Sequence, residues 1–483
     1  MAIEWQLQEV TWPTDPPAAA AAFADGAELA WLDSSIDVTP AVSGARYSLI
    51  CARLIACLAQ CDRQPATLTV AGRICESDVN AWQLWRRTLE RLPRAELAPC
   101  GLTPGWIGYV GFEAAQLLER LPASHRADLG LPLLRLALYD RGIVLDHHQR
   151  RALAISAPGV AEALGLHNAD RYADWIQRWQ AAAETQQYQV QTATPRLCHE
   201  IAQAEHERIV GRALEYIAAG DIYQVNLAQC MRLEGVGDPV AVYAAIRRAN
   251  PAQYGALLRW DDCAVASVSP ELFLRCEAGR VLTRPIKGTR PRTRDAALDE
   301  VYCQALRDSA KDAAELAMIV DLHRNDLGRV CEYGSVRVSQ PRVLETHPTV
   351  FHTVAEVTGQ LARGRDGLDL LAACFPAGSV TGVPKIRAIE IIDELEPVAR
   401  GVYTGAVGVL GLDGQMTFNV AIRTLQIRGS MATLYVGGGI VADSDPADEY
   451  QETLDKARGI LSGLLNGPAG MVATRSQDGL ALG

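Results

Sequence analysis

The sequence predicts an α+β fold in which antiparallel sheets are covered by helices. After residue 200, strand-like runs at 263–269, 271–276 and 281–286 follow one another across short connections. Two such runs joined by a turn that contains glycine, here at 277–279, are typical of a β-hairpin. Hairpins outnumber strand–helix–strand units in this chain, and they therefore favour antiparallel sheets over a parallel one.

The other elements are expected in both halves of the chain. In the first half, short strands at 68–70 and 136–139 are mixed with helical runs, and the apolar run that contains Cys51, Cys57 and Cys61 is predicted to be helical. Apolar residues at helical spacing predict later helices at 202–219 and 306–327, the first ending at Gly220. Further strands are expected at 405–412, 417–425 and 433–437.

Composition excludes several classes of protein. The 483 residues are 49% hydrophobic and 21% charged, which is ordinary for a globular protein. A net charge of -11 argues against a general binder of nucleic acids or anionic membranes, because both surfaces are negative. The twelve cysteines form no CxxC pair or zinc-spaced cluster. Without a signal-peptide pattern or an apolar run near the ~20 residues that span a bilayer, a cytoplasmic location is expected.

The first candidate for chemistry is a single lysine at the end of a predicted strand. Lys287 is flanked by Pro285 and Gly288, which constrain the backbone on one side and allow close approach on the other. A lysine is a nucleophile only as a neutral amine, so its pKa must fall through burial or nearby cations, which Arg284 and Arg290 could supply. On spacing alone, a solvated lysine is the simpler interpretation.

Two further segments combine polar groups with a helix. Glu315 lies in the charged helical run 311–329. A helix face with ordinary salt bridges and a functional site explain these charges equally well. The loop 375–385, rich in Gly, Pro, Ser and Thr, precedes an amphipathic helix, and a helix N-terminus favours anions. Taken alone, this second segment is better explained as an ordinary loop.

A glycine-rich segment is followed by a helix with a charged face. Gly437–Gly439 offer backbone N–H groups, and Asp445 with Pro446 predicts the start of the helix. Glu449, Glu452 and Lys456 share one face of that helix. Two carboxylates and an ammonium facing a glycine loop suit an anionic ligand bridged by Mg²⁺, although a surface helix with ordinary ion pairs is the simpler alternative.

Together these segments resemble the chorismate-binding enzyme family, which includes anthranilate, aminodeoxychorismate, isochorismate and salicylate synthases. The resemblance is dense over about residues 200–466 and looser before them, for instance at 29–34. The matching segments are 220–227, 269–271, 285–289, 314–329, 378–385, 403–405, 422–424 and 448–456.

The resemblance implies an architecture for the whole chain. Large antiparallel sheets are expected to pack face to face, with helices outside, as a single complex fold. Residues 1–190 would form an N-terminal companion region, and residues 191–466 the catalytic region. The polar stretch 181–195 is interpreted as a linker between them, and 467–483 as a flexible tail.

The resemblance also assigns roles to residues of this sequence. Lys287 would attack C2 of chorismate as a covalent nucleophile, and Glu271 would protonate the departing 4-hydroxyl. Mg²⁺ would be held by Glu315 and Glu452, with Glu449 as a neighbouring or alternative ligand. The residues implied to bind or line the substrate site are Gln224, Gly288, Thr289, His352, Thr381, Tyr403, Arg423, Gly437, Gly438, Gly439 and Lys456.

Two positions distinguish the reactions of the family. The resemblance places Gln224 where isochorismate and salicylate synthases carry a water-activating lysine, and this implies an amine as the nucleophile. It places Lys287 where anthranilate synthases carry alanine and aminodeoxychorismate synthases carry lysine. The implied reaction is therefore amination of chorismate by ammonia to 4-amino-4-deoxychorismate, in 4-aminobenzoate and folate biosynthesis.

The remaining expectations concern partners and alternatives. The chain carries no recognisable glutaminase motif, so a separate glutamine amidotransferase subunit is expected to supply ammonia. Relatives hold tryptophan in the N-terminal half, and Ser34 lies near where that pocket would be. Anthranilate synthase component I and a catalytically silent chorismate-binding subunit are the alternative functions.

Overall fold

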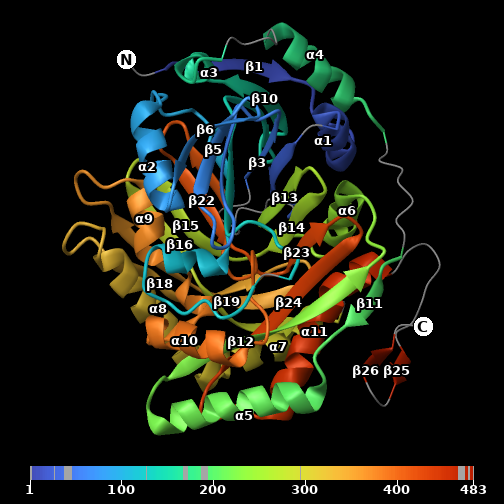
Figure 1. Cartoon of the computed structure of the whole chain (residues 1–483). Coiled ribbons are helices and arrows are strands. Elements are labelled where there is room, and N and C mark those ends of the chain that lie inside the picture. Colours follow the sequence, from blue (N-terminus) through green and yellow to red (C-terminus); the bar gives the residue numbers. More distant parts are fainter. Residues whose placement is uncertain are drawn as a thin grey trace.

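The protein has two large antiparallel sheets of twelve strands each, with helices on their outer faces (Figure 1). The computed structural model describes residues 3–26, 28–36, 46–126, 128–166, 172–186, 194–293, 295–465, 474–476 and 479–481. This architecture confirms the predicted α+β class. Within the described ranges, no helix is both long and apolar enough to cross a membrane.

The first sheet combines strands from both halves of the chain. Its order is β1 (Gln6–Val10), β10 (Arg151–Ser156), β9 (Arg141–Asp146), β3 (Tyr47–Ala52), β2 (Leu29–Asp33), β13 (Tyr254–Trp260), β14 (Cys263–Ser269), β23 (Thr424–Arg428), β24 (Met431–Ile440), β12 (Gln224–Glu234) and β11 (Arg196–His199). The short β20 (Gly382–Val383) also pairs with β12.

The second sheet is mixed in the same way. Its order is β17 (Ile286–Pro291), β19 (Val350–Gln360), β16 (Arg280–Arg284), β15 (Leu272–Glu277), β22 (Met416–Val420), β21 (Ala406–Gly411), β7 (Gly105–Val110), β8 (Leu134–Leu138), β4 (Ala56–Gln60), β5 (Ala66–Val70) and β6 (Arg73–Asp78), with β18 (Arg337–Thr346) paired to β19. Residues before 190 therefore supply one end of each sheet.

Helices cover the outer faces of both sheets (Figure 1). Those against the first sheet are α1 (Pro16–Ala24), α4 (Tyr172–Ala183), α5 (Gln203–Ala219), α6 (Pro239–Ala249), α10 (Lys385–Leu395) and α11 (Pro446–Leu465). Those against the second sheet are α2 (Ala81–Arg91), α7 (Ala296–Asp308), α8 (Ala310–Gly328) and α9 (Gly367–Cys374). The other short elements are α3 (Val160–Ala163), η1 (Phe112–Leu117), η2 (Gly378–Val380) and the hairpin β25 (Thr474–Ser476) with β26 (Gly479–Ala481).

The alternation of side chains along the strands divides the core into layers. On β2, Ala30 and Leu32 pack between the sheets against Val407 and Val409 of β21. Trp31 points to the other face, into the apolar cluster beneath α1, α4, α6 and α11. The two sheets therefore pack face to face, as expected.

Two sequence predictions of helices were wrong. The run from Cys51 to Cys61 forms β3 and β4 rather than a helix, because a strand buried on both faces, as β3 is, shows no alternation of polar residues. The single helix predicted over 306–327 is two helices, α7 and α8. They divide at Ser309, whose hydroxyl accepts a hydrogen bond from the Asp312 N–H and caps α8.

The chain changes sheets at two neighbouring places. It passes from β14 to β15 through Pro270 and Glu271, and returns from β22 to β23 through 421–423. The strand predicted over 417–425 is therefore two strands in different sheets. Likewise, the strand predicted over 281–286 is interrupted at Pro285, which has no N–H to donate.

The expected linker and tail lie partly outside the described residues. The linker was predicted over 181–195. Its first residues belong to α4, and residues 187–193 lie outside the residues that the structure describes. The predicted tail is outside it as well, apart from the β25–β26 hairpin.

Candidate active site

The candidate site lies where the chain crosses between the sheets. The two crossings are hydrogen-bonded to their surroundings: the Val420 N–H donates to the Glu271 carbonyl at 3.0 Å, and the Val268 N–H donates to the Arg423 carbonyl at 3.1 Å. Glu271 and Arg423 thus come from residues that belong to neither sheet. The other predicted residues of the site come from β12, β17, β19, β24, α8 and α11, except Thr381, which follows η2, and Tyr403, which lies in the segment before β21.

Lys287 lies on β17 with its amine close to a carboxylate. Its Nζ is 3.8 Å from Oε2 of Glu315 on α8, and its side chain is 12% exposed. Burial lowers the pKa of Lys287 from its ordinary value, and the ammonium of Lys456 lowers it further against the opposing field of Glu315. This environment favours the neutral amine that a nucleophile requires.

The two arginines expected to act on Lys287 are engaged elsewhere, so this part of the prediction was wrong. Arg284 is buried between Glu345 and Glu356, with its Nε 3.0 Å from the Glu356 carboxylate. Arg290 extends to Asp312, at 3.4 Å. Their carboxylate partners offset their charges, and Lys456 is the cation that lowers the pKa of Lys287.

Gly439 brings Gln224 and Lys287 together. A Cβ atom at this position would lie 2.5 Å from Nε2 of Gln224 and 3.2 Å from Nζ of Lys287. Gln224 is 1% exposed, and its Oε1 has no hydrogen-bond partner among the described residues. A side chain at 439 would displace both groups, so glycine keeps this space open.

Gly438 likewise keeps space open, in this case beside the carboxylates of α11. A Cβ atom there would lie 2.9 Å from Oε2 of Glu449 and 3.6 Å from Oε1 of Glu452. Lys456 bonds Glu452 at 2.7 Å and donates to the Gly437 carbonyl at 2.7 Å. The shared helix face is confirmed, and so is the Asp445 cap that begins the helix. The three glycines lie within β24, paired with β12, and not in the loop that was expected.

Glu271 has the environment of a general acid. It is 4% exposed, and its Oε1 has no partner within the described part of the chain. Burial raises the pKa of Glu271 from 4.5 to about 7, against the opposing effects of the Ser379 hydroxyl and the Lys287 ammonium. A carboxyl with this pKa is about half protonated near neutral pH, so a substantial fraction of the protein has a proton available for a leaving group.

Arg423 and Tyr403 approach the site from strained backbone. Arg423 has a φ of 52° and Thr404 a φ of 58°, in the left-handed region that non-glycine residues rarely adopt. Such conformations are held by their surroundings and cluster at functional sites. Burial lowers the pKa of Arg423, while Glu271 raises it. Tyr403 stacks on Tyr435 with a centroid distance of 5.5 Å.

The remaining predicted residues line two sides of the site. Thr289 and His352 share a hydrogen bond of 2.8 Å between Oγ1 and Nδ1, and burial holds the pKa of His352 well below its usual value. Gly288 has a φ of 83°, and a Cβ there would lie 2.9 Å from the Thr353 hydroxyl. Thr381 is buried, and its carbonyl accepts the Asn226 N–H at 2.7 Å.

Three residues outside the predicted set contribute polar groups here. Asn226 shares a face of β12 with Gln224 and is buried, and the buried hydroxyl of Ser379 acts to lower the pKa of Glu271. Burial raises the pKa of Glu449 and opposes the lowering of the pKa of Glu452, and the ammonium of Lys311 on α8 acts on both carboxyls in the lowering direction. The two-residue spacing of Gln224 and Asn226 was a usable signal, whereas the position of Lys311 depends on how α8 packs.

This set of residues agrees with a family match. Residues 56–462 match the family described as chorismate binding enzyme. The chain belongs to this family.

Two enzyme types recur among its relatives. Aminodeoxychorismate synthase component 1 of Klebsiella aerogenes is 40% identical over 380 residues, which are 77% of this chain and 81% of that one. Anthranilate synthase component 1 of Streptomyces coelicolor is 41% identical over 379 residues, or 75% and 73%. The crystal structure of anthranilate synthase component I from Streptococcus pneumoniae TIGR4 has a TM-score of 0.77 and 28% identity, over 88% of this chain and 94% of that one.

The acidic residues of this chorismate binding enzyme fit a divalent ion shared with a ligand. Within the described ranges, no three His, Cys, Asp or Glu side chains could hold a metal ion together. The two expected metal ligands are Glu315, which lies beside Lys287, and Glu452, which lies beside Gly438. Glu449 also lies beside Gly438, and its buried Oε2 has no hydrogen-bond partner among the described residues. Carboxylate oxygens suit Mg²⁺, which commonly binds one or two protein carboxylates and completes its shell from substrate and water.

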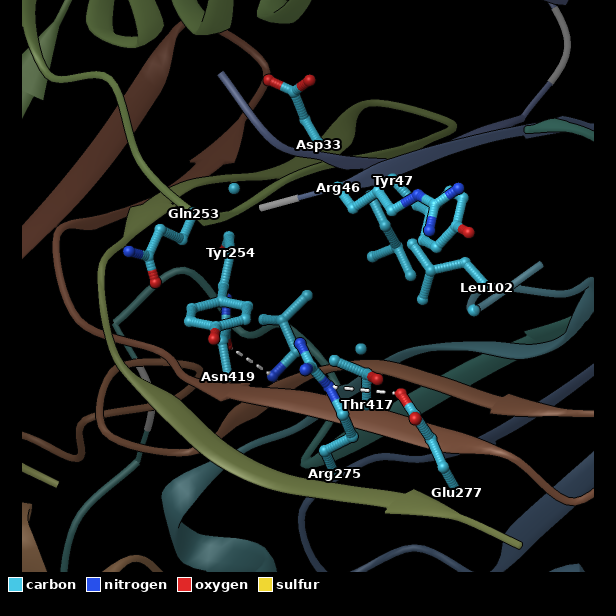
Figure 2. A pocket seen from close by; sticks show the side chains of 15 residues that line it. Asp33, Arg46, Tyr47, Leu102, Gln253, Tyr254, Arg275, Glu277, Thr417 and Asn419 are labelled. Carbon is cyan, nitrogen blue, oxygen red and sulfur yellow. Dashed lines mark hydrogen bonds and ion pairs between the residues drawn. The ribbon is translucent and has the colours of Figure 1, made fainter. Parts of the chain in front are cut away.

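A cavity of about 220 Å³ lies between the sheets of this chorismate binding enzyme (Figure 2). Arg46, Tyr47 and Tyr254 line it together with Gln253, whose amide has no hydrogen-bond partner in the described structure. Ser34 is buried directly after the lining residue Asp33, and its N–H donates to the Ser48 hydroxyl at 2.9 Å. The structure thus places Ser34 beside the cavity wall.

Proposed function

We propose that this chorismate binding enzyme is the large component of an aminodeoxychorismate synthase. It would convert chorismate and ammonia to 4-amino-4-deoxychorismate, in 4-aminobenzoate and folate biosynthesis. The observation that carries the proposal is the buried Lys287 amine, which lies 3.8 Å from Glu315 and faces the space kept open by Gly439. An alanine in its place would leave no nucleophile there.

The proposed mechanism has two steps, and Lys287 takes part in both of them. Lys287 attacks C2 of chorismate through its neutral amine, while Glu271 gives its proton to the 4-hydroxyl, which leaves as water. Ammonia then adds at C4 and expels Lys287, so the net change is substitution of OH by NH₂. Gln224 orients ligands without activating water, because an amide is not a base.

The substrate's negative charges are met by the rest of the site. Arg423, Tyr403 and Lys456 would hold its two carboxylates, helped by the backbone of Gly437–Gly439. Mg²⁺ bound at Glu315 and Glu452 would supply charge neutralisation for a carboxylate that otherwise faces two glutamates.

Two expectations about the cellular setting belong to the same proposal. Relatives are named as component 1 of a synthase, which supports a second component for this chain as well. We expect that component to be a glutamine amidotransferase that supplies ammonia, and we expect the complex to act in the cytoplasm.

Identification of the product tests the proposal directly. The purified chain is incubated with chorismate, Mg²⁺ and an ammonium salt, and the products are separated by chromatography. We expect 4-amino-4-deoxychorismate. Anthranilate with pyruvate would identify an anthranilate synthase instead, and chorismate that stays unaltered would indicate a silent binding subunit.

Loss of a magnesium ligand should appear as a changed metal requirement. Glu315→Gln should raise the Mg²⁺ concentration for half-maximal turnover roughly tenfold or more, because the amide cannot supply the charge of the carboxylate. Glu205→Gln, on the exposed side of α5, is the matched control and should leave the Mg²⁺ titration unchanged. An unaltered titration in Glu315→Gln would remove Glu315 from the metal site.

We further propose that the cavity between the sheets is where tryptophan binds, next to Ser34. Its aromatic and apolar walls, and the Gln253 amide that has no hydrogen-bond partner among the described residues, suit an aromatic amino acid (Figure 2). Calorimetric titration with L-tryptophan should show one site per chain. Leu102→Trp, at the cavity wall, should fill the space and weaken binding at least roughly tenfold. Absence of binding heat in the wild type at several temperatures would contradict this assignment.

A further inference from the structure

Arg400 has one of the largest fully buried side chains of the described structure, although it carries a full charge. Its side chain is 1% exposed. It lies in the segment between α10 and β21, with its guanidinium 4.6 Å from the centroid of the Phe112 ring. A charge buried this deeply is tolerated only where its donors are satisfied.

The guanidinium donates to β12, to η2 and to Thr404, which lies four residues further along its own segment. Nη2 donates to the Asn226 carbonyl on β12 at 2.6 Å. Nη1 donates to the Val380 carbonyl in η2 at 3.1 Å and to the Thr404 hydroxyl at 3.0 Å. Two of these bonds therefore join Arg400 to elements that are distant in sequence, and the third joins it to the turn at 404 in its own segment.

Its counter-ion adds a second link to β12. Arg400 bonds both carboxylate oxygens of Glu396, at 2.9 and 2.5 Å, and Oε1 of Glu396 also accepts the Ala228 N–H at 2.9 Å. The pair thus forms one polar unit that spans β12, η2, the end of α10 and the turn at 404.

Every contacted segment bears residues of the candidate site. β12 carries Gln224, η2 is followed directly by Thr381, and Thr404 follows Tyr403. Thr404 is one of the strained residues, with a φ of 58°, and such a conformation persists only where the surroundings hold it. None of the Arg400 side-chain bonds reaches the open space at Gly439, so Arg400 acts through other residues.

A buried ion pair is a weak source of stability, because apolar side chains of similar volume often serve as well or better. What an arginine supplies in addition is a rigid planar fork that reaches several acceptors in fixed directions. A lysine ammonium at this place cannot reach three separated acceptors at once. The arrangement is therefore better explained by geometry than by stability.

We propose that Arg400 is a positioning residue that sets the relative places of Gln224, Thr381 and Tyr403 around the bound substrate. The proposal rests on the chorismate site assigned above, and it holds whichever amination product the site forms. Misplacement of reacting groups by about 1 Å can cost roughly 100-fold in rate, so loss of the fork should reduce turnover strongly.

The test compares two buried arginines by consumption of chorismate. Arg400→Lys keeps the charge and loses the fork. Arg135→Lys is the matched control, since Arg135 on β8 is 11% exposed and bonds Glu28 at 2.6 Å, but touches no residue of the site. Both are assayed at a temperature where circular dichroism shows that they are folded. We expect kcat to fall about 100-fold in Arg400→Lys and to change little in Arg135→Lys.

A rescue experiment separates positioning from general damage. In Arg400→Ala, millimolar guanidinium chloride should restore kcat at least tenfold, whereas methylammonium chloride should not. Equal loss of kcat in both lysine variants, wild-type kcat in Arg400→Lys, or the absence of rescue in a folded Arg400→Ala would each overturn the proposal. Failure of the wild type itself to consume chorismate would instead refute the proposed function.

Discussion

Replacing Lys287 by alanine should lower the rate of chorismate amination by roughly 10³-fold or more. The variant loses the amine nucleophile whose covalent intermediate replaces one difficult displacement with two easier steps. The wild-type protein mixed with chorismate, without ammonia, should gain the mass of chorismate less one water, as the Nζ–C2 bond forms and the 4-hydroxyl leaves. Intact-mass spectrometry should show this adduct in the wild type and not in Lys287→Ala.

A neighbouring cation provides the control for this result. Arg290→Ala removes a side chain three residues away that is bound to Asp312 and 35% exposed. This variant should keep most of its activity and should still form the adduct. Turnover at the wild-type rate in Lys287→Ala would remove Lys287 from the mechanism, whichever product is formed.

The parts of the site that were predicted correctly are those determined within one helix. Glu449, Glu452 and Lys456 share a face because the spacing of three and four residues places them there, whatever the helix packs against. The cap at Asp445 is equally local, since its carboxylate accepts the N–H groups of the next turn at 2.9 and 3.1 Å.

The electrostatic environment of Lys287 could not be predicted, because it depends on distant partners. Arg284 is adjacent in sequence, yet Glu345 and Glu356 come from β18 and β19 and offset its charge. Lys456 is 169 positions away and acts on Lys287 because α11 packs beside β24. Sequence neighbours thus suggested the wrong cations.

The same limit applies to the fold. Hairpins predicted the antiparallel class correctly, because a hairpin is a local unit. Where a strand leaves one sheet for the other, as at Glu271 and at 421–423, depends on packing between the sheets, so two strands were joined in the prediction. Arg400 carries no pattern of its own, and its role is visible only once β12, η2 and Thr404 surround it.

Replacing Glu271 by glutamine should reduce turnover by roughly 10²–10⁴-fold, the usual contribution of a general acid. The amide keeps the size of the side chain but has no acidic proton to give to the 4-hydroxyl. Mg²⁺-dependent binding of chorismate, measured by equilibrium titration, should be largely retained. Glu332→Gln, on the exposed surface after α8, is the control, and unchanged turnover in Glu271→Gln would exclude the role as acid.

The free energy of unfolding of the same variant should depend less on pH than that of the wild type. Burial raises the pKa of Glu271 from 4.5 to about 7, so between these values the folded state binds a proton that the unfolded state releases. The free energy of unfolding therefore falls as pH rises through this window, and the loss is complete above pH 7. Urea denaturation measures the free energy of unfolding of both proteins at pH 5 and at pH 8. Between these pH values, it should fall by about 2–3 kcal/mol more in the wild type than in Glu271→Gln. Equal losses would mean that the carboxyl is already ionised at neutral pH, and a carboxylate could not protonate the leaving hydroxyl. The burial that makes Glu271 an acid is thus also a measurable cost to the fold.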